Sequence, residues 1–396
     1  MLPVADALQR ILALVAPTGS EEVPLAGAAG RVLATDAVAG QNQPPFPASA
    51  MDGYAVRAGD ARQGAKLRVT AEAQAGDGVP RRVGPGEAVR IFTGAPVPEG
   101  ADAILIQENA RREDDSVEVV EAPTAWTFIR AAGMDFAQGF RLASPRRLNA
   151  RELALLAAMN AATLTVARRP KVALIPTGDE LIRPGETPGP GQIVSSNDIG
   201  LAAMLAAAGA EPLPCAIARD SRESLLAALE EAKEADFIVT LGGASVGDHD
   251  LVAEVFGSAG LQLDFYKIAM RPGKPLMAGR IGRRVMIGLP GNPVSSMVCG
   301  EVFLRPAVDA ALGLPSGPRQ TRTAFLAHDL PANGPREHYM RAVVSPAADG
   351  IMRCEVAENQ DSSLVATLAR ANALAVRPPG AAPARAGSPV AYIPLD

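Results

Sequence analysis

Residues 236–250, DFIVTLGGASVGDHD, join a short apolar run to a glycine-rich, acidic loop. Residues 237–241 are apolar and rich in β-branched side chains, which is typical of a strand buried on both faces of a parallel sheet. The run ends in glycines and aspartates: Gly242, Gly243, Gly247, Asp248 and Asp250. Because ligands of open α/β sheets bind beyond the carboxyl ends of the strands, we expect the functional site at this loop.

The chemistry of this loop has two interpretations. Glycines let backbone N–H groups approach an anion, but two aspartates repel a phosphate unless a hard cation such as Mg²⁺ lies between them. A tight turn followed by a helix N-cap at Asp248 or Asp250 explains the same residues. Taken alone, the stretch favours neither interpretation.

The surrounding sequence predicts an α/β domain. Strand-like runs alternate with helical stretches of roughly ten to thirteen residues, which implies βαβ units and a mostly parallel sheet. The predicted strands are 171–176, 212–218, 236–241, 261–269 and 284–289, and the predicted helices are 199–210, 221–233, 251–260 and 294–311. We expect Asp220, with Glu223 three residues later, to begin the second helix.

Two β-rich regions flank this domain. Short strands with Gly and Pro turns fill residues 54–140 and return after the linker 313–318. The N-terminus begins with an amphipathic helix over 3–16, and Asn149 with Glu152 predicts a capping box. The rigid, proline-rich loop 41–53 is either an interdomain connection or a functional loop.

The fold class is therefore multidomain α/β plus β. We expect a central three-layer α/β domain with a mostly parallel sheet at 171–315, a small β domain inserted in the N-terminal half at 46–139, and a C-terminal β-barrel-like domain at 316–396.

Composition excludes several classes of function. The 396 residues carry a net charge of −5 and only 4% aromatic residues, which disfavours nucleic acid as a partner. Three cysteines and three histidines lack zinc-site spacing. The N-terminus has no export signal, and the most apolar helical stretch, 153–167, is interrupted by polar residues. We expect a cytoplasmic protein that does not enter the membrane.

Four loops of the α/β domain carry chemically useful residues: 176–181, 242–250, 271–275 and 289–293. Asp179 and Glu180 supply carboxylates, and Arg271 and Lys274 supply cations suited to phosphate oxygens. This mixture predicts a phosphorylated ligand bridged by a metal ion, although surface ion pairing explains the same charges. The chain has neither a Walker loop nor a GxGxxG motif, and it offers no Ser-His-Asp triad.

Seven motifs, in order along the chain, resemble one family. They are SAMDGYAVR (49–57), RIFTGAPVP (90–98), AGMDF (132–136), TGDEL (177–181), GGASVGDHD (242–250), RPGKP (271–275) and LPGNPVS (289–295). In this order they are similar to the molybdopterin molybdenumtransferases of the MoeA type, which are related to the E domain of gephyrin.

The resemblance implies a reaction and an assembly. Molybdate is inserted into adenylylated molybdopterin with release of AMP, and Mg²⁺ is the expected cofactor. The family forms a homodimer in which the MDGYA-containing region of one subunit faces the α/β domain of the other. Residues 1–45 and 140–170 together form a discontinuous dimerisation domain, and other proteins of molybdenum cofactor biosynthesis are possible partners.

The resemblance also assigns site residues. The catalytic set is Asp52, Glu180, Asp220 and Asp250, of which Glu180 and Asp250 bind the metal. The substrate-binding set is Thr93, Asp135, Gly242, Gly243, Ser245, Lys267, Arg271, Lys274, Pro290, Pro293, Arg341 and Ser362. Lys267 and Arg271 would hold molybdate or phosphate, and Arg341 and Ser362 lie in the most weakly patterned region.

The chain departs from the family pattern at three positions. Leu241 replaces a hydroxyl residue before the paired glycines, Pro176 replaces a Ser, and position 271 is Arg instead of Lys. Two alternative functions remain open. One is molybdopterin adenylylation, which usually uses a lone α/β domain; the other is a non-catalytic dimeric scaffold like gephyrin E.

Overall fold

A computed structural model describes residues 1–78, 81–243 and 251–395. The chain divides into two compact units, Met1–Glu21 with Ala167–Asp396 (unit 1) and Glu22–Val166 (unit 2). Unit 1 contains an α/β domain and a C-terminal barrel, and unit 2 contains two β-rich parts. No helix in the described residues combines the length and hydropathy that a membrane span requires.

The α/β domain has a six-stranded sheet with the order β18-β15-β19-β23-β22-β20. Its strands are Glu211–Pro214 (β18), Lys171–Pro176 (β15), Phe237–Leu241 (β19), Arg284–Leu289 (β23), Met277–Ile281 (β22) and Leu261–Tyr266 (β20). The first four pair in parallel, whereas β22 pairs antiparallel with both β23 and β20. The predicted mostly parallel sheet is confirmed, and β22 is a strand that the sequence did not predict.

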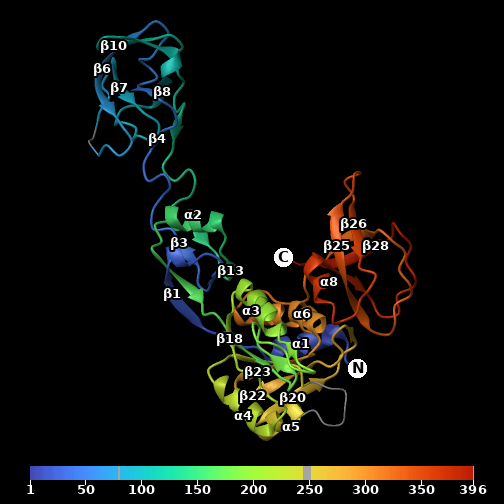
Figure 1. Cartoon of the computed structure of the whole chain (residues 1–396). Coiled ribbons are helices and arrows are strands. Elements are labelled where there is room, and N and C mark those ends of the chain that lie inside the picture. The colour runs from blue at the N-terminus through green and yellow to red at the C-terminus, as the bar shows by residue number, and fades with distance from the viewer. Residues whose placement is uncertain (79–80, 244–250, 396) are drawn as a thin grey trace. The chain divides into compact units, whose positions relative to one another are not determined.

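Helices cover both faces of this sheet. The helices Arg222–Glu231 (α4) and Leu251–Ser258 (α5) pack on one face. The other face carries Val4–Leu14 (α1), Asn197–Ala207 (α3), Pro293–Cys299 (α6) and Arg305–Ala311 (α7) (Figure 1). A π-helical segment, Gly300–Leu304, joins α6 to α7.

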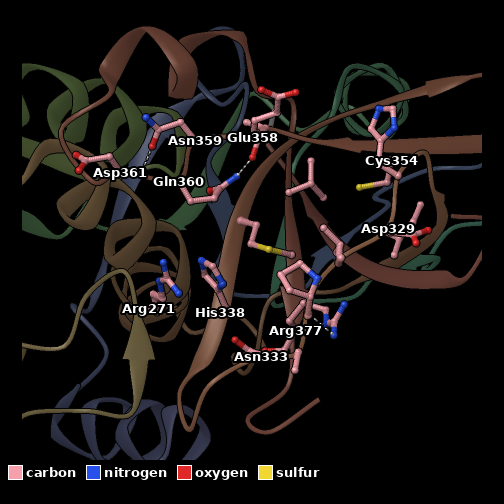
Figure 2. A pocket seen from close by; sticks show the side chains of 18 residues that line it. Arg271, Asp329, Asn333, His338, Cys354, Glu358, Asn359, Gln360, Asp361 and Arg377 are labelled. Carbon is pink, nitrogen blue, oxygen red and sulfur yellow. Dashed lines mark hydrogen bonds between the residues drawn. The ribbon is translucent and has the colours of Figure 1, made fainter. Parts of the chain in front are cut away.

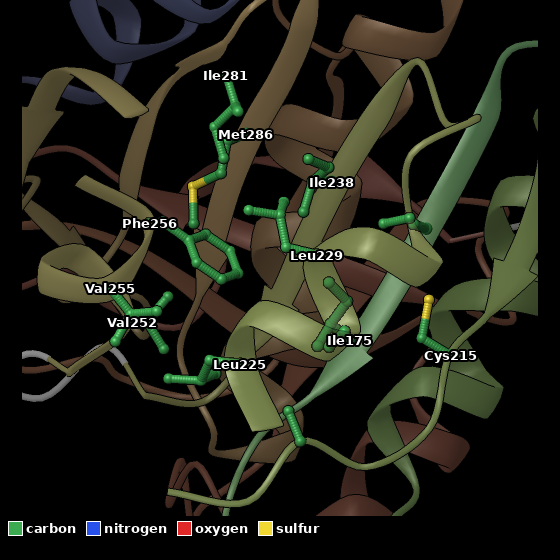
Figure 3. Packing of buried hydrophobic residues seen from close by; sticks show 14 of the residues in the cluster. Ile175, Cys215, Leu225, Leu229, Ile238, Val252, Val255, Phe256, Ile281 and Met286 are labelled. Carbon is green, nitrogen blue, oxygen red and sulfur yellow. The ribbon is translucent and has the colours of Figure 1, made fainter. Parts of the chain in front are cut away.

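The core under α4 and α5 explains why these segments form layers. Leu225 and Leu229 of α4 and Phe256 of α5 are buried against Ile238 and Met286 of the sheet (Figure 3). Burying each such side chain stabilises the fold by roughly 1.5–3 kcal/mol. Residues 237–241 are all buried, as the apolar run predicted.

The start of α4 corrects one prediction. Its N-cap is Ser221, whose hydroxyl accepts a hydrogen bond from the Ser224 N–H at 3.2 Å. Asp220, the predicted first residue, lies one position earlier and does not cap the helix. Both residues suit an N-cap chemically, so the sequence alone could not choose between them.

The C-terminal domain is a closed barrel. Its strands are Arg322–Leu326 (β24), Glu337–Pro346 (β25), Met352–Val356 (β26), Ala373–Arg377 (β27) and Pro389–Pro394 (β28). They pair in the order β25-β26-β24-β28-β27, and β27 pairs again with β25. Helix Val365–Arg370 (α8) precedes β27, and the short strand Met270–Arg271 (β21) of the α/β domain pairs in parallel with β25.

Unit 2 contains the predicted small β domain. Its six-stranded sheet has the order β8-β5-β7-β6-β10-β9. The strands are Gly53–Val56 (β5), Lys66–Ala73 (β6), Glu87–Ile91 (β7), Ala103–Ile106 (β8), Ala110–Glu113 (β9) and Ser116–Val119 (β10). Buried Val, Ile, Leu and Ala side chains on both faces form two small cores.

The second part of unit 2 brings distant segments of the chain together. A four-stranded sheet has the order β1-β14-β2-β13, made of Ser20–Pro24 (β1), Thr163–Ala167 (β14), Val32–Leu33 (β2) and Arg146–Arg147 (β13). Helix Ala150–Ala158 (α2) begins with the predicted capping box of Asn149 and Glu152. Two short strand pairs complete it: Ala37–Val38 (β3) with Arg141–Leu142 (β12), and Ala48–Ser49 (β4) with Ile129–Arg130 (β11).

This pairing bears on the domain limits. Segments near residues 20–38 and 141–167 share one sheet, whereas α1 packs on α7 and β22 in unit 1. The discontinuous domain of 1–45 and 140–170 therefore stays a proposal, which the shared sheet supports for the residues after β1 begins.

Candidate functional site

A cavity of about 830 Å³ opens at the carboxyl ends of β15, β19 and β23. We call it the acidic cavity, because Glu180 and Asp220 are among its lining residues. Four of the predicted substrate-binding residues also line it: Gly242, Gly243, Pro290 and Pro293. The structure thus brings together predicted residues from four connecting segments, at the sheet edge where an α/β fold places its ligands.

Glycines allow these loops to approach each other. Gly242 has a φ of +107°, and a Cβ there would lie 2.8 Å from the Thr177 carbonyl oxygen. A Cβ on Gly291 would lie 3.4 Å from the Cα of Gly242. Gly178 has a φ of +143°, and a Cβ there would collide with the Glu180 carboxylate. The loop after β15 is therefore shaped for glycine at the point where Glu180 enters the cavity.

The carboxylates form an electrostatically strained group. The Asp220 N–H donates to the Asp179 carboxylate at 3.1 Å, so the two loops touch. Burial, and then the negative charges of Asp179 and Glu180, raise the pKa of the Asp220 carboxyl above its ordinary value. A cation would relieve this repulsion, because an opposite charge favours the ionised carboxylate.

The loop 289–293 is held by hydrogen bonds from residues of α3 and α6. Asn197 donates through Nδ2 to the Gly291 carbonyl at 2.7 Å, and the Ser296 hydroxyl donates to the Pro290 carbonyl. These two bonds fix the main chain beside Gly242. Asn197 was not predicted as a site residue, because an Asn that begins a helix is ordinarily interpreted as a cap.

The predicted cations lie elsewhere in the described structure. Lys267 adopts a φ of 70°, and its Nζ lies 4.9 Å from the centre of the Tyr266 ring. The Lys274 carbonyl accepts a bond from the Ile268 N–H at 3.1 Å. Neither lysine is among the residues that line the acidic cavity, where Pro275 is the nearest member of their loop.

Arg271 faces a second cavity. This space of about 810 Å³ lies at the barrel, and Figure 2 shows Arg271 beside His338, with Arg377 also at the wall. Burial, and then the charges of Arg271 and three further arginines, lower the pKa of His338 to about 4. The imidazole is therefore neutral at ordinary pH, and positive charge surrounds it.

Arg341 holds the segment between β26 and α8. Its guanidinium is 1% exposed and donates to the carbonyls of Asn359, Asp361 and Leu364. Ser362 contributes its carbonyl, which accepts a bond from the Val294 N–H at 3.1 Å at the start of α6. In this structure Arg341 thus supports a loop, and the loop contacts the acidic-cavity side of the α/β domain through its backbone.

Three predicted residues belong to unit 2. One Asp52 oxygen accepts bonds of 2.8 Å from both the N–H and the hydroxyl of Thr93, and these two bonds lower the pKa of Asp52. The Asp135 N–H donates to the Gln43 carbonyl at 2.9 Å. Asp52 and Thr93 therefore form a preset pair, whereas Asp135 is tied through its backbone.

The donor set fits Mg²⁺ in a particular way. No group of three or more His, Cys, Asp or Glu side chains in the described ranges is arranged as a metal cage. Mg²⁺ keeps several waters and is usually bound by one or two carboxylates plus substrate phosphates, so a wall that carries Glu180 and Asp220 is compatible with this ion. Asp250 and Ser245, also predicted here, lie outside the described residues.

Family models match three successive parts of the chain. They are the MoeA N-terminal region (domains I and II) over residues 2–160, a probable molybdopterin binding domain over 173–310, and the MoeA C-terminal region (domain IV) over 323–395. The acidic cavity lies mainly on loops of the second match.

Relatives and solved structures agree with these matches. The chain is 38% identical over 344 residues to the molybdopterin molybdenumtransferase of Nostoc sp., covering 84% of this chain and 79% of the relative. It is 32% identical over 390 residues to that of Bacillus subtilis, covering 96% and 90%. A crystal structure of the molybdopterin biosynthesis MoeA protein from Pyrococcus horikosii superposes with a TM-score of 0.87, at 29% identity, over 100% of this chain and 99% of that one.

Proposed function

Because the chain belongs to the MoeA family of molybdopterin molybdenumtransferases, and so is an enzyme of molybdenum cofactor biosynthesis, we propose that it inserts molybdate into adenylylated molybdopterin and releases AMP. The observation that carries this proposal is the acidic cavity. It combines Glu180 and Asp220 with closely packed glycine loops at the functional edge of the sheet.

The reaction places two demands on the site. Adenylylated molybdopterin contains a phosphoanhydride, and its cleavage by water breaks the phosphorus–oxygen bond that joins AMP to the pterin phosphate. The transfer of a phosphoryl group is catalysed mainly by positioning and by neutralising charge. Bound Mg²⁺ would supply charge neutralisation at the phosphate oxygens.

The other demand, positioning of the cation and the substrate, falls to residues of the chain. Glu180 and Asp220 would hold the cation, and the loops of Gly242 and Pro290 would orient the substrate.

Molybdate is a tetrahedral dianion and needs cations. As the family resemblance implies, we assign Lys267 and Arg271 to its capture, although in this structure Lys267 does not line the acidic cavity and Arg271 faces the barrel cavity. Homodimer formation and a cytoplasmic location are further parts of the proposal, and sedimentation analysis of the purified protein would test the dimer.

The test is molybdate-dependent release of AMP. Purified protein is mixed with adenylylated molybdopterin and Mg²⁺, with and without molybdate, and AMP is followed by chromatography. We expect release that requires molybdate and falls about 100-fold or more in Glu180→Gln, as for loss of a transition-state interaction. The matched control is Glu230→Gln, because Glu230 is exposed on α4 and pairs with Lys233 at 2.8 Å.

The alternative functions predict other outcomes. An adenylyltransferase would consume ATP and molybdopterin to form the adenylylated product instead of cleaving it. A scaffold would bind the pterin without releasing AMP under any condition. Tight binding with no release by the wild type would refute the transferase proposal.

A further inference from the structure

We propose that Arg219 is a positioning residue that assembles the carboxylates of the acidic cavity and so prepares them for a divalent cation. The inference rests on the proposed function, because it assumes that Glu180 and Asp220 form the working part of the site. Arg219 is not a predicted site residue and does not line the cavity.

The guanidinium of Arg219 gathers the main chain of the loop after β15. Its Nη1 lies 3.3 Å from the Gly178 carbonyl oxygen, 2.9 Å from that of Asp179 and 3.0 Å from that of Leu181. Three carbonyls converging on one nitrogen bend residues 178–181 around the cation. The Asp179 and Glu180 side chains are both exposed, and each projects from the backbone between two carbonyls that bond to Arg219.

The backbone of Arg219 is anchored on the other side, at α4. Its N–H donates to the Ser224 hydroxyl at 2.9 Å, and its carbonyl accepts from the Ser221 N–H at 2.7 Å. The next residue is Asp220, whose N–H donates to the Asp179 carboxylate at 3.1 Å. Arg219 therefore links the segment before α4, which carries Asp220, to the loop that carries Glu180.

This link opposes the electrostatic repulsion between the two loops. Asp179, Glu180 and Asp220 repel each other, which tends to separate the two loops and to lower the density of oxygen ligands. Main-chain bonds between Ala218 and residues 176–178 join the loops at their base, and Arg219 adds three bonds beyond them. Arg219 opposes the separation through main-chain oxygens. Among the described residues the Arg219 guanidinium donates to these main-chain carbonyls, so apart from the Asp179 oxygen that accepts the Asp220 N–H, the carboxylate oxygens of the group stay available to a cation.

The chemistry of arginine suits this task. A guanidinium is planar and permanently charged, with donors spread over a fork, whereas lysine offers a compact point charge on a flexible chain. Lysine should therefore replace part of the function, and glutamine, which is uncharged, should replace little of it. Partial rescue by Arg219→Lys is an expected signature of positioning.

The experiment compares four proteins: wild type, Arg219→Gln, Arg219→Lys and the control Arg222→Gln. Arg222 is a neighbour on α4 that donates to the Ser258 hydroxyl at 2.8 Å and does not contact the loop after β15. Mn²⁺ serves as the probe cation, and its binding is titrated by electron paramagnetic resonance without substrate. AMP release gives kcat and KM, and far-UV circular dichroism monitors folding.

We expect Arg219→Gln to weaken Mn²⁺ binding and lower kcat by about 10- to 100-fold, the usual effect of removing a residue that orients ligands, with little change in KM for the pterin. Arg219→Lys should lie between this variant and the wild type, and Arg222→Gln should match the wild type. Mn²⁺ affinity and kcat within about twofold of wild type in Arg219→Gln would overturn the inference.

Two outcomes separate this inference from the proposed function. If the wild type releases no AMP, the transferase proposal fails, yet the Mn²⁺ titration still decides whether Arg219 organises the carboxylates. If Arg219→Gln does not fold, Arg219→Lys decides alone. Mn²⁺ affinity equal to that of the wild type in Arg219→Lys would then count against the inference.

Discussion

The buried hydroxyl of Thr240 destabilises the centre of the α/β domain. It lies on the central strand β19, is 0% exposed, and its hydroxyl has no hydrogen-bond partner among the described residues. Valine has nearly the same shape and lacks the hydroxyl. We therefore predict that Thr240→Val stabilises unit 1, although most substitutions in a core destabilise it.

The magnitude follows from the burial. An unpaired buried hydroxyl costs roughly 1–3 kcal/mol relative to water. The second methyl of valine is larger than the hydroxyl that it replaces, and its neighbour on β23 is Gly288. Overpacking costs about 1 kcal/mol or more. Subtracting the overpacking cost from the middle of this range leaves an expected net gain of about 1 kcal/mol in the free energy of unfolding.

The two units can be followed separately in urea. The single tryptophan, Trp126, belongs to unit 2, whereas most of the helices belong to unit 1. Far-UV circular dichroism should show the transition of unit 1 moving to higher urea in Thr240→Val, and Trp126 fluorescence should not change. Thr177→Val is the matched control, because the Thr177 hydroxyl donates to the Leu241 carbonyl at 3.4 Å.

A control that loses a hydrogen bond should not stabilise the protein. If Thr240→Val left the transition unchanged or moved it to lower urea, the hydroxyl would have a partner that compensates its burial. The reasoning from an unpaired hydroxyl would then be refuted.

Three further predictions concern His338, the capping box of α2 and Gly178. Mainly because of burial, the pKa of His338 is about 4 in the folded protein against an ordinary value of 6.5, so the unfolded chain binds a proton more readily. The contribution of His338 to the free energy of unfolding is therefore fully present above pH 6.5 and should fall by about 3 kcal/mol as the pH falls to 4. Urea titrations of His338→Gln across this window should show a smaller dependence on pH. Asn149→Ala removes the capping box of α2 and should lower the stability of unit 2 by about 1 kcal/mol, and an unshifted Trp126 transition would contradict this. Gly178→Ala forces a Cβ onto the Glu180 carboxylate at a φ of +143°, so AMP release should fall as in Glu180→Gln, and full activity would exclude this geometry.

Much of the fold was predictable because its signals are local. The buried strand at 237–241, the capping box at Asn149 and the β-rich character of the C-terminal region follow from short-range patterns, and the structure confirms them, although the last barrel strand, Pro389–Pro394, was not predicted. The strand Met277–Ile281 escaped prediction because its alternation is interrupted by Gly279 and Arg280. It forms through pairing with β20, which a local pattern cannot reveal.

The site was predictable in its acids but not in its supports. Glu180 follows a glycine at a strand end, so topology places it at the edge of the sheet, whereas Asp220 was predicted from the family resemblance. Arg219 and Asn197 act by donating to backbone carbonyls, and the sequence does not show which carbonyls a side chain will meet. The positions of Arg271 and Arg341 depend on tertiary packing for the same reason.

The place of α1 in unit 1 affects how the chain folds during synthesis. The first helix packs on α7 and β22, and Thr18 bonds to the Ala311 carbonyl at 2.9 Å through its N–H. Ribosomes add about 5–20 residues per second, so the apolar face of α1 waits roughly 15–60 s for its partners. Unit 2 is complete long before then. The apolar face of α1 therefore stays without its unit 1 partners until residue 311 has been made, although it is among the first segments of this sequence to be synthesised.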